Sequence, residues 1–189
     1  MTPLGYALFD TAIGRCGIAW SEAGVTRVAF PEATEAATRA RLTRGQTDPG
    51  EAGPPLAIAA AITAIGALLA TGRADLSAII LDMEAVTGED RPFLNAARET
   101  PAGATITYGE LAARAGRPGA AREAGQAMAR NRFPIVVPCH RVLAAGGFGG
   151  FSAPGGVEAK ARLLTIERAA IGQEPSLFDD LPIAVRPGG

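Results

Sequence analysis

The change in sequence pattern at residues 87–90 limits the possible folds more than any other feature of this chain. Before these residues, short apolar segments rich in β-branched and aromatic residues alternate with turns and two helical segments. After them, helical segments separated by turns with glycine and proline predominate. Because strands and helices differ in hydrophobic period, this change predicts two domains. We expect an α/β domain at residues 1–88, a mainly α-helical domain at residues 89–170, and a flexible tail at residues 171–189.

The first 88 residues are expected to form a small sheet with two helices. β-Branched and aromatic residues bounded by glycine predict strands, with a hairpin turn at residues 21–24. Gly72 follows an apolar helical segment, which is typical of a helix C-terminus. Cys16 belongs to no motif, and we expect it to be structural. The expected strands cover residues 6–9, 17–20, 25–30 and 76–86, and the expected helices cover residues 32–44 and 56–69, with a polar loop at residues 45–55.

The helical domain contains the pattern of a helix-turn-helix motif. Thr107 precedes one helical segment and Glu110 follows three residues later, the spacing of a capping box. A glycine-containing turn at residues 116–119 joins this helix to the next one, as in helix-turn-helix proteins. The expected helices cover residues 92–100, 107–115 and 120–130.

The second helix of this pair has an unusually small surface. Alanines dominate it, and only Arg122 and Gln126 project far enough to reach DNA, with Glu123 opposing them. A helix that reads bases in the major groove normally carries several arginine, asparagine or glutamine side chains. The pattern therefore fits a buried packing helix, or a helix that lies close to DNA and reads little sequence. Both interpretations hold if one face packs and the other meets DNA.

The distribution of charge allows a polyanionic partner. The whole chain has a formal net charge of −1, but residues 1–100 carry −4 and residues 101–168 carry +5. A basic segment of this kind can attract a polyanion such as DNA. The same excess is compatible with an ordinary solvated surface.

Composition and patterning exclude several other classes of protein. The longest apolar stretch, residues 55–70, is shorter than the ~20 residues of a membrane span. No basic segment followed by an apolar one opens the chain, so we expect neither secretion nor a membrane partner. Two cysteines exclude a disulfide scaffold. With His140 as the single histidine and no cofactor motif, we expect no metal and no cofactor.

Residues 131–142 carry the strongest chemical signal. An apolar run at residues 135–137 leads into the sequence Pro-Cys-His-Arg at residues 138–141, which places the cysteine at the end of a buried segment. A thiol with a pKa of about 8.5 needs a base or positive surroundings to act as a nucleophile at neutral pH. His140 can supply the base and Arg141 the positive charge. An inert buried thiol beside a hydrogen-bonded core histidine remains the alternative.

These residues resemble the active-site motif of the O6-alkylguanine-DNA alkyltransferases, also called methylated-DNA–protein-cysteine methyltransferases. The resemblance covers residues 101–167 and consists of several motifs in order. It implies a DNA-repair protein that flips an alkylated guanine out of the duplex and irreversibly transfers the alkyl group to its own cysteine. The matching motifs are Thr107-Tyr108-Gly109-Glu110-Leu111-Ala112, Ala120-Ala121-Arg122, Asn131, Pro138-Cys139-His140-Arg141-Val142, and Gly155-Gly156 followed by Lys160, Leu163-Leu164 and Glu167.

The resemblance also implies roles for individual residues. The expected catalytic residues are Cys139 as the alkyl acceptor, His140 as its base, Glu167 as the residue that orients His140, and Asn131 as a brace for the turn. The expected DNA contacts are Tyr108 at the phosphate of the target nucleotide, Arg122 in the space left by the flipped base, and Ala121, Gln126 and Arg141. The expected base pocket contains Val142, through its backbone carbonyl, together with Phe151 and Ser152.

The expected partner is therefore double-stranded DNA that contains O6-alkylguanine, with O4-alkylthymine as a further candidate substrate. We expect a cytoplasmic monomer associated with a bacterial nucleoid, with neighbours that could cooperate along DNA. Two alternatives remain open. A lesion-binding relative without transfer activity lacks the acceptor cysteine, so Cys139 argues against it. A helix-turn-helix transcription regulator must read sequence, which the alanine-rich helix disfavours.

Overall fold

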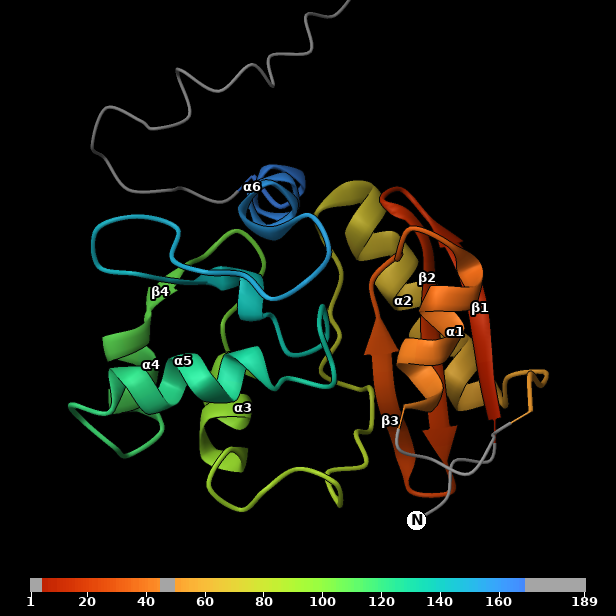
Figure 1. Ribbon diagram of the computed structural model, residues 1–189, viewed down its shortest axis with the longest axis horizontal. Helices are drawn as coiled ribbons and strands as arrows, with labels where there is room; N and C mark the ends of the chain where they lie inside the picture. Colours follow the sequence, from red (N-terminus) through yellow and green to blue (C-terminus); the bar gives the residue numbers. More distant parts are fainter. Residues whose placement is uncertain (1–4, 45–49, 169–189) are drawn as a thin grey trace, which may run out of the picture.

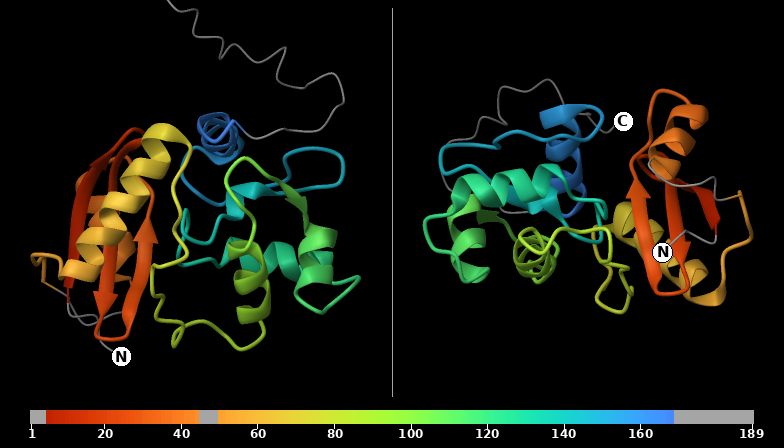
Figure 2. Two further views of the ribbon diagram at one scale, coloured as in Figure 1. Left: turned by 180° about the vertical axis from the view of Figure 1, so that it is seen from behind. Right: turned by 60° about the horizontal axis from the view of Figure 1, so that its bottom comes forward.

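The computed structural model describes residues 5–44 and 50–168, and it places a small sheet with two helices beside a group of four helices (Figure 1). The strands β1 (Gly5–Thr11), β2 (Gly14–Ser21) and β3 (Gly24–Ala29) form an antiparallel sheet in the order β1-β2-β3. The helices α1 (Glu35–Thr43) and α2 (Leu56–Thr71) cover its two faces (Figure 2). The predicted combination of a small sheet with helices is confirmed. The expected tail at residues 171–189 lies outside the described residues.

The second half of the chain is mainly helical. The elements of this half are α3 (Arg91–Arg98), β4 (Ile106–Thr107), α4 (Tyr108–Arg114), α5 (Ala121–Ala129), η1 (Cys139–Arg141), β5 (Val142–Leu143) and α6 (Gly156–Ile166). Of these, η1 is a 3-10 helix that contains the Cys-His-Arg sequence.

The alternation of side chains along β2 explains why helices pack on both faces of the sheet. Successive strand residues point to opposite faces. Ile18 therefore joins the large core on the α2 side, whereas Ala19 packs in a small cluster with Leu42 of α1. A Cβ atom at Gly17 would clash with the end of the Leu42 side chain, so a larger residue there would force Leu42 to shift where α1 crosses the sheet.

Side-chain caps define where two helices begin. The first helix was expected at residues 32–44, but α1 starts at Glu35 because Thr34 Oγ1 accepts from the amide of Ala37 at 3.2 Å. The predicted capping box of α4 is confirmed. Thr107 Oγ1 accepts from the Glu110 amide at 3.1 Å, and Glu110 Oε2 accepts from the Thr107 amide at 2.6 Å.

The predicted strand at residues 76–86 is wrong. Within this segment only Leu81 forms a bridge to the sheet, beside Val25 of β3. The backbone turns on both sides of that bridge. The buried carboxylate of Asp82 accepts from Ser21 Oγ at 2.7 Å, which interrupts the apolar run. Short apolar segments fit either a strand or a buried turn, and here the side chains fill the core without a strand ladder.

Two strands of two residues each, β4 and β5, were not predicted. Ile106 pairs with Val142 and Thr107 pairs with Leu143 in a parallel arrangement. This pairing brings Tyr108, the first residue of α4, close to the end of η1. No local pattern marks a strand of two residues, because its only support is a partner far away in the sequence.

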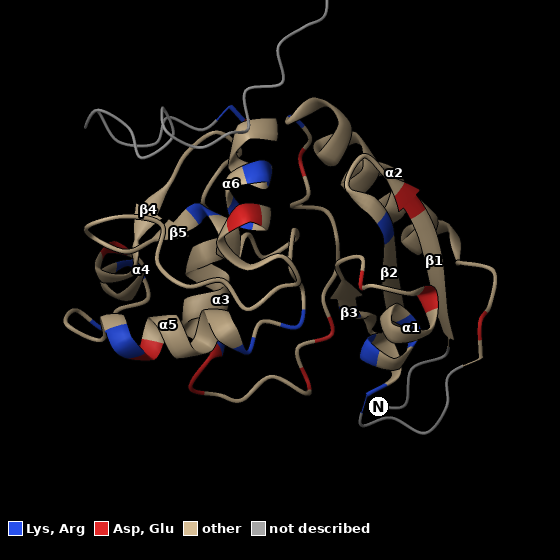
Figure 3. Ribbon diagram, turned by 45° about the horizontal axis from the view of Figure 1, so that its top comes forward, with Lys and Arg blue, Asp and Glu red and all other residues tan. Residues whose placement is uncertain are grey.

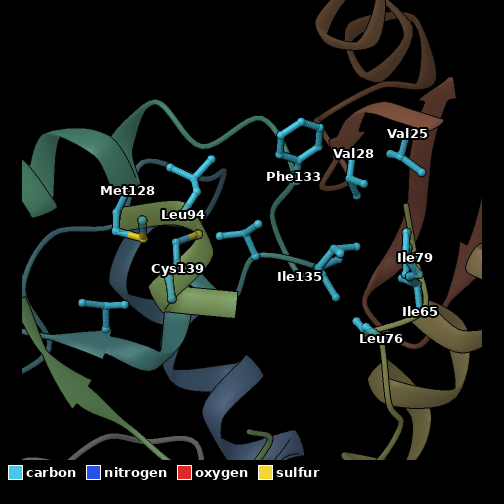
Figure 4. Close-up of a cluster of buried hydrophobic side chains, with 14 of the residues drawn as sticks. Val25, Val28, Ile65, Leu76, Ile79, Leu94, Met128, Phe133, Ile135 and Cys139 are labelled. Atoms are coloured by element: carbon cyan, nitrogen blue, oxygen red, sulfur yellow. The ribbon is translucent and has the colours of Figure 1, made fainter. Parts of the chain in front are cut away.

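A continuous group of buried side chains extends from the sheet to the Cys-His-Arg turn (Figure 4). Val28 of β3 and Phe133 belong to the same cluster as Cys139. The amide of Val28 also donates to the carbonyl of Arg132 at 2.9 Å, which ties the edge of β3 to the segment after α5. The core therefore crosses the division predicted at residue 88.

In the described part of the chain, no helix is both long and apolar enough to cross a membrane.

Candidate active site

A pocket of about 440 Å³ lies between α4, α5 and the loop that precedes α6, and Cys139 forms part of its wall. The small residues of α5 line one side, so the helix can approach the loop and still leave room for a ligand. The lining residues are Gly125, Met128 and Ala129 of α5, Gly150, Phe151 and Ser152 of the loop, and Tyr108 and Cys139.

Asn131 holds the loop that presents Cys139, a residue only 8% exposed. Asn131 Nδ2 donates to the carbonyl of Val137 at 2.8 Å, and its Oδ1 accepts from the amide of Phe133 at 2.9 Å. Within the loop, Ile135 has a φ of 76°, a left-handed conformation that β-branched residues rarely adopt. Strained backbone of this kind persists only where its surroundings hold it, and Asn131 bonds the chain on both sides of Ile135.

Behind the cysteine, His140, Arg141 and Glu167 form a buried network. His140 Nε2 lies 2.9 Å from Glu167 Oε1. Arg141 donates to the same carboxylate at 2.7 Å and 2.9 Å. Burial opposes ionisation of the carboxyl, but the hydrogen bonds from His140 and Arg141 outweigh it and lower the pKa of Glu167 to about 2. Glu167 is therefore ionised at neutral pH and can only accept hydrogen bonds.

The state of Glu167 defines the tautomer of His140. Because the carboxylate only accepts, His140 Nε2 carries the proton, and Nδ1 is the unprotonated nitrogen. Burial, together with the charges of Arg141 and Lys160, lowers the pKa of His140 despite the opposing effect of Glu167, so the imidazole is neutral at neutral pH. His140 Nδ1 is buried and has no hydrogen-bond partner among the described residues. The site thus holds a neutral base with a free acceptor nitrogen.

The thiol of Cys139 and the phenol of Tyr108 in the pocket are both protonated at neutral pH. Burial raises the pKa of the Cys139 thiol above its ordinary value, although the hydrogen bond with Asn131 and the charge of Lys160 act in the opposite direction. Burial, followed by the proximity of Cys139, also raises the pKa of Tyr108. The thiol therefore needs a base, and the phenol can serve as a proton donor.

Lys160 is a buried cation that holds the pocket loop in place. Its ammonium donates to the carbonyls of Val142 at 2.7 Å and Phe148 at 2.6 Å. It also lies 5.9 Å from the ring centroids of both Tyr108 and Phe151.

Val142 was expected in the base pocket, but it is absent from the described lining. Its side chain is buried and its carbonyl is bound to Lys160.

Phe151 and Ser152, which were expected in the base pocket, do line this cavity. Phe151 packs edge to face on Phe30, with ring centroids 5.9 Å apart, so the segment after β3 supports the pocket wall. Ser152 Oγ lies 3.4 Å from the carbonyl of Ala129, which connects the loop to α5.

The residues expected to contact DNA differ in exposure. Arg122 and Gln126 are exposed on α5, whereas Ala121 at the start of this helix is half-buried. Tyr108 is half-buried in the pocket wall. Of the residues expected to contact DNA, Arg122 and Gln126 therefore have side chains that can reach a duplex lying on the outer face of α5.

The expected DNA contact of Arg141 is wrong. Its side chain is buried, and its guanidinium donates to Glu167 and to the carbonyl of Thr100 at 2.5 Å. The η1 turn directs this side chain inward, toward the end of α6. Arg141 therefore positions the carboxylate that supports His140.

Sequence reasoning missed the role of Lys160 and the part that α5 plays in the pocket. One signal was present: Lys160 is the single lysine in a chain with 17 arginines. A compact ammonium can bond two carbonyls in a space where a planar guanidinium does not fit.

Within residues 5–44 and 50–168, no group of three or more histidine, cysteine or acidic side chains could hold a metal ion.

The fold and the site define a class of protein: a paired-helix protein with a buried free cysteine beside a carboxylate-supported histidine. Residues 90–169 match the family described as 6-O-methylguanine DNA methyltransferase, DNA binding domain. A methylated-DNA–protein-cysteine methyltransferase of Methanothermobacter thermautotrophicus is 35% identical over 156 residues, which cover 82% of this chain and 80% of that relative. The chain belongs to the methylated-DNA–protein-cysteine methyltransferase family.

Two further comparisons extend the similarity over almost the whole chain. A methylated-DNA–protein-cysteine methyltransferase of Mycolicibacterium paratuberculosis is 34% identical over 175 residues, 92% of this chain and 98% of the relative. The crystal structure of Mycobacterium tuberculosis OGT in complex with DNA is similar with a TM-score of 0.68 and 29% identity. It covers 87% of this chain and 92% of that one.

Proposed function

We propose that this protein repairs alkylated DNA by transferring the alkyl group from O6 of a modified guanine to Sγ of Cys139. The observation that carries the proposal is the position of Cys139 in the wall of a pocket of about 440 Å³, next in sequence to a neutral His140. Pockets of roughly 300–1,000 Å³ are typical of sites for small ligands, a class that includes a nucleobase. Membership of the family and the similarity to a structure in complex with DNA support a DNA substrate.

A guanine stacked in a duplex cannot reach Cys139, so the base must leave the stack. In this proposal α4 and α5 act as a helix-turn-helix, with α5 against the minor groove. The small residues of α5 permit a close approach without sequence readout, which suits damage that occurs in any sequence. Arg122 fills the space left by the base, and this offsets part of the few kcal/mol that extrusion costs. Tyr108 directs the phosphate of the target nucleotide.

The chemical step moves one alkyl group and keeps the protons balanced. Cys139 gives its proton to His140 Nδ1 through a bridging water, and Glu167 stabilises the imidazolium. The thiolate attacks the alkyl carbon, so the S–C bond forms as the C–O6 bond breaks and its electron pair passes to guanine. Tyr108 donates a proton to the departing guanine and then regains a proton from solvent. The imidazolium of His140 releases its extra proton to solvent, so the number of protons on the protein and the base stays balanced.

The product is a thioether, which neither thiols nor water readily cleave, so each monomer acts once. Cys16 offers no second acceptor. It is buried in β2 with its Sγ 3.5 Å from Thr11 Oγ1, and burial raises its pKa to about 11.

Intact-mass spectrometry after incubation with a duplex containing O6-methylguanine tests this proposal. We expect a gain of one methylene per protein, mapped to Cys139, and no second turnover. The same experiment with a duplex that contains O4-methylthymine defines the range of substrates. Lesion binding without a gain in mass would contradict the proposal in favour of a lesion-binding protein. Preference for one undamaged sequence would favour a regulator.

Replacement of Arg122 by alanine is expected to slow transfer from duplex DNA by about tenfold or more, which corresponds to at least ~1.4 kcal/mol of lost support for the extrahelical base. Transfer from the free base O6-methylguanine should keep its rate, because a free base needs no extrusion. Single-turnover rates on both substrates measure the difference, with Arg73→Ala as a matched control at an exposed loop. Equal slowing on both substrates would remove Arg122 from base extrusion.

A further inference from the structure

Four arginines gather where β3, α1 and the segment after α5 meet. Arg27 lies on β3, Arg41 and Arg44 lie at the end of α1, and Arg132 follows α5. We call these four residues the arginine cluster. The hydrogen bond from the Val28 amide to the Arg132 carbonyl holds the segment after α5 on the edge of β3. Burial, and then the charges of the other three arginines, lower the pKa of Arg27 to about 10.

Two carboxylates of the described residues, those of Glu32 and Asp82, act on the charge of the arginine cluster. Glu32 Oε1 lies 3.5 Å from Arg41 Nη1. Asp82 lies within electrostatic range of Arg132, but its carboxylate accepts from a serine hydroxyl and a backbone amide. Within the described part of the chain, the Nε atoms of Arg27 and Arg132 are buried and have no hydrogen-bond partner. The four arginines therefore repel one another in a partly dehydrated place where two guanidinium nitrogens lack partners, and an anionic ligand would relieve the repulsion.

The cluster continues the exposed face of α5 toward the sheet. The views from two directions place α5 and α1 on the same side of the molecule (Figures 1 and 2). Figure 3 shows basic residues on α5, on the chain that follows it and on α1. Arg44 is exposed and the other three arginines are half-buried, so a ligand can reach them. A long polyanion bound along α5 can therefore extend to the cluster.

We propose that the arginine cluster binds backbone phosphates of the DNA duplex, outside the base pairs that α5 contacts. Guanidinium groups match the geometry of phosphate oxygens and bind them with paired hydrogen bonds. A duplex carries one negative charge per roughly 1.7 Å of its axis, so it can serve several arginines at once. An acidic protein surface offers the same charge without this continuity with α5. The inference rests on the proposed function and adds a second DNA-contacting surface to it.

Binding to long and short lesion-containing duplexes tests the inference. All variants carry Cys139→Ala, so that the lesion fixes the position of the protein and no transfer occurs. The duplexes have O6-methylguanine at the centre and contain about 24 or about 8 base pairs, the shorter one spanning roughly 27 Å. The double variant Arg27→Gln, Arg44→Gln is compared with its parent and with the exposed-loop control Arg73→Gln. Fluorescence anisotropy between 50 and 200 mM salt gives the affinities.

We expect the double variant to flatten the log–log salt slope on the long duplex by about 2, one unit for each lost phosphate contact. Its affinity for the short duplex should match that of the parent, and Arg73→Gln should change neither. An unchanged slope on the long duplex would overturn the inference, even if the cluster binds an acidic protein. Equal losses on both duplexes would overturn it too.

The failure of this inference is distinguishable from the failure of the proposed function. With Cys139 restored, the double variant should accept a methyl group from the free base at the parental rate, which shows that the pocket is intact. If the parent transfers methyl groups from duplex DNA while the salt slopes coincide, only the role of the cluster is refuted. If the parent takes up no methyl group, the proposed function itself is wrong.

Discussion

Replacement of Cys139 by alanine is expected to abolish alkyl transfer while affinity for lesion-containing duplex stays nearly unchanged. Among the side chains that line the pocket, the thiol has the neutral base His140 as its neighbour in sequence, whereas the Ser152 hydroxyl has no base bonded to it among the described residues. In the proposed function, binding depends instead on α5 and its exposed side chains. Intact mass measures the transfer, and anisotropy with the same duplex measures the affinity.

Cys16→Ala is the matched control for this experiment. Cys16 is fully buried in β2, away from the pocket lining, so its removal should leave the gain of one methylene per folded molecule intact. Loss of DNA binding together with transfer in Cys139→Ala, with an unchanged melting temperature, would mean that the thiol belongs to the binding surface. Residual transfer would mean that another residue accepts the alkyl group.

Glu167→Gln is expected to reduce both stability and the rate of transfer. The substitution leaves the guanidinium of Arg141 buried without a counter-charge, and breaking a buried pair in this way typically costs about 3–5 kcal/mol. For a chain of this length the melting temperature should fall by roughly 10 °C. Transfer should slow further per folded molecule, because His140 loses the carboxylate that stabilises its imidazolium. Calorimetry and single-turnover mass measurements separate the two effects.

The pH dependence of stability distinguishes an ionic role of Glu167 from a purely steric one. Its pKa is lowered from 4.5 to about 2 in the folded chain. A carboxyl group whose pKa is lowered by folding stabilises the folded state at pH values above its pKa in the unfolded chain. This contribution disappears as the pH falls from about 4.5 toward 2. The difference in unfolding free energy between wild type and Glu167→Gln should therefore be constant near neutral pH and shrink below pH ~4.5. Urea unfolding at several pH values measures it.

Glu158→Gln is the control for the stability experiment, because Glu158 lies exposed in the first turn of α6. We expect this variant to unfold within about 0.5 kcal/mol of wild type. A pH-independent difference for Glu167→Gln would show that packing, and not charge, is lost. An unchanged transfer rate would remove Glu167 from the mechanism.

The parts of the protein that depend on neighbouring residues could be predicted from the sequence. Thr107 and Glu110 lie three residues apart and form the predicted capping box, because both partners belong to one helical turn. The antiparallel sheet follows from short strands joined by glycine turns, as at Gly24, and it is present. Cys139 and His140 are adjacent in the chain, so a thiol and a base could be assigned to one site before any fold was known.

The directions of side chains and the distant partners could not be predicted in the same way. Arg141 points inward because η1 turns it toward Glu167, 26 residues further along the chain, and Val142 bonds Lys160 instead of lining the pocket. The apolar segment at residues 76–86 forms turns because its side chains fill the core between the sheet and the helices. The sequence by itself determined the local helices, the three strands of the antiparallel sheet and the chemical groups of the site. The tertiary structure decided which of these groups face the pocket, because their orientation depends on contacts between residues far apart in the chain.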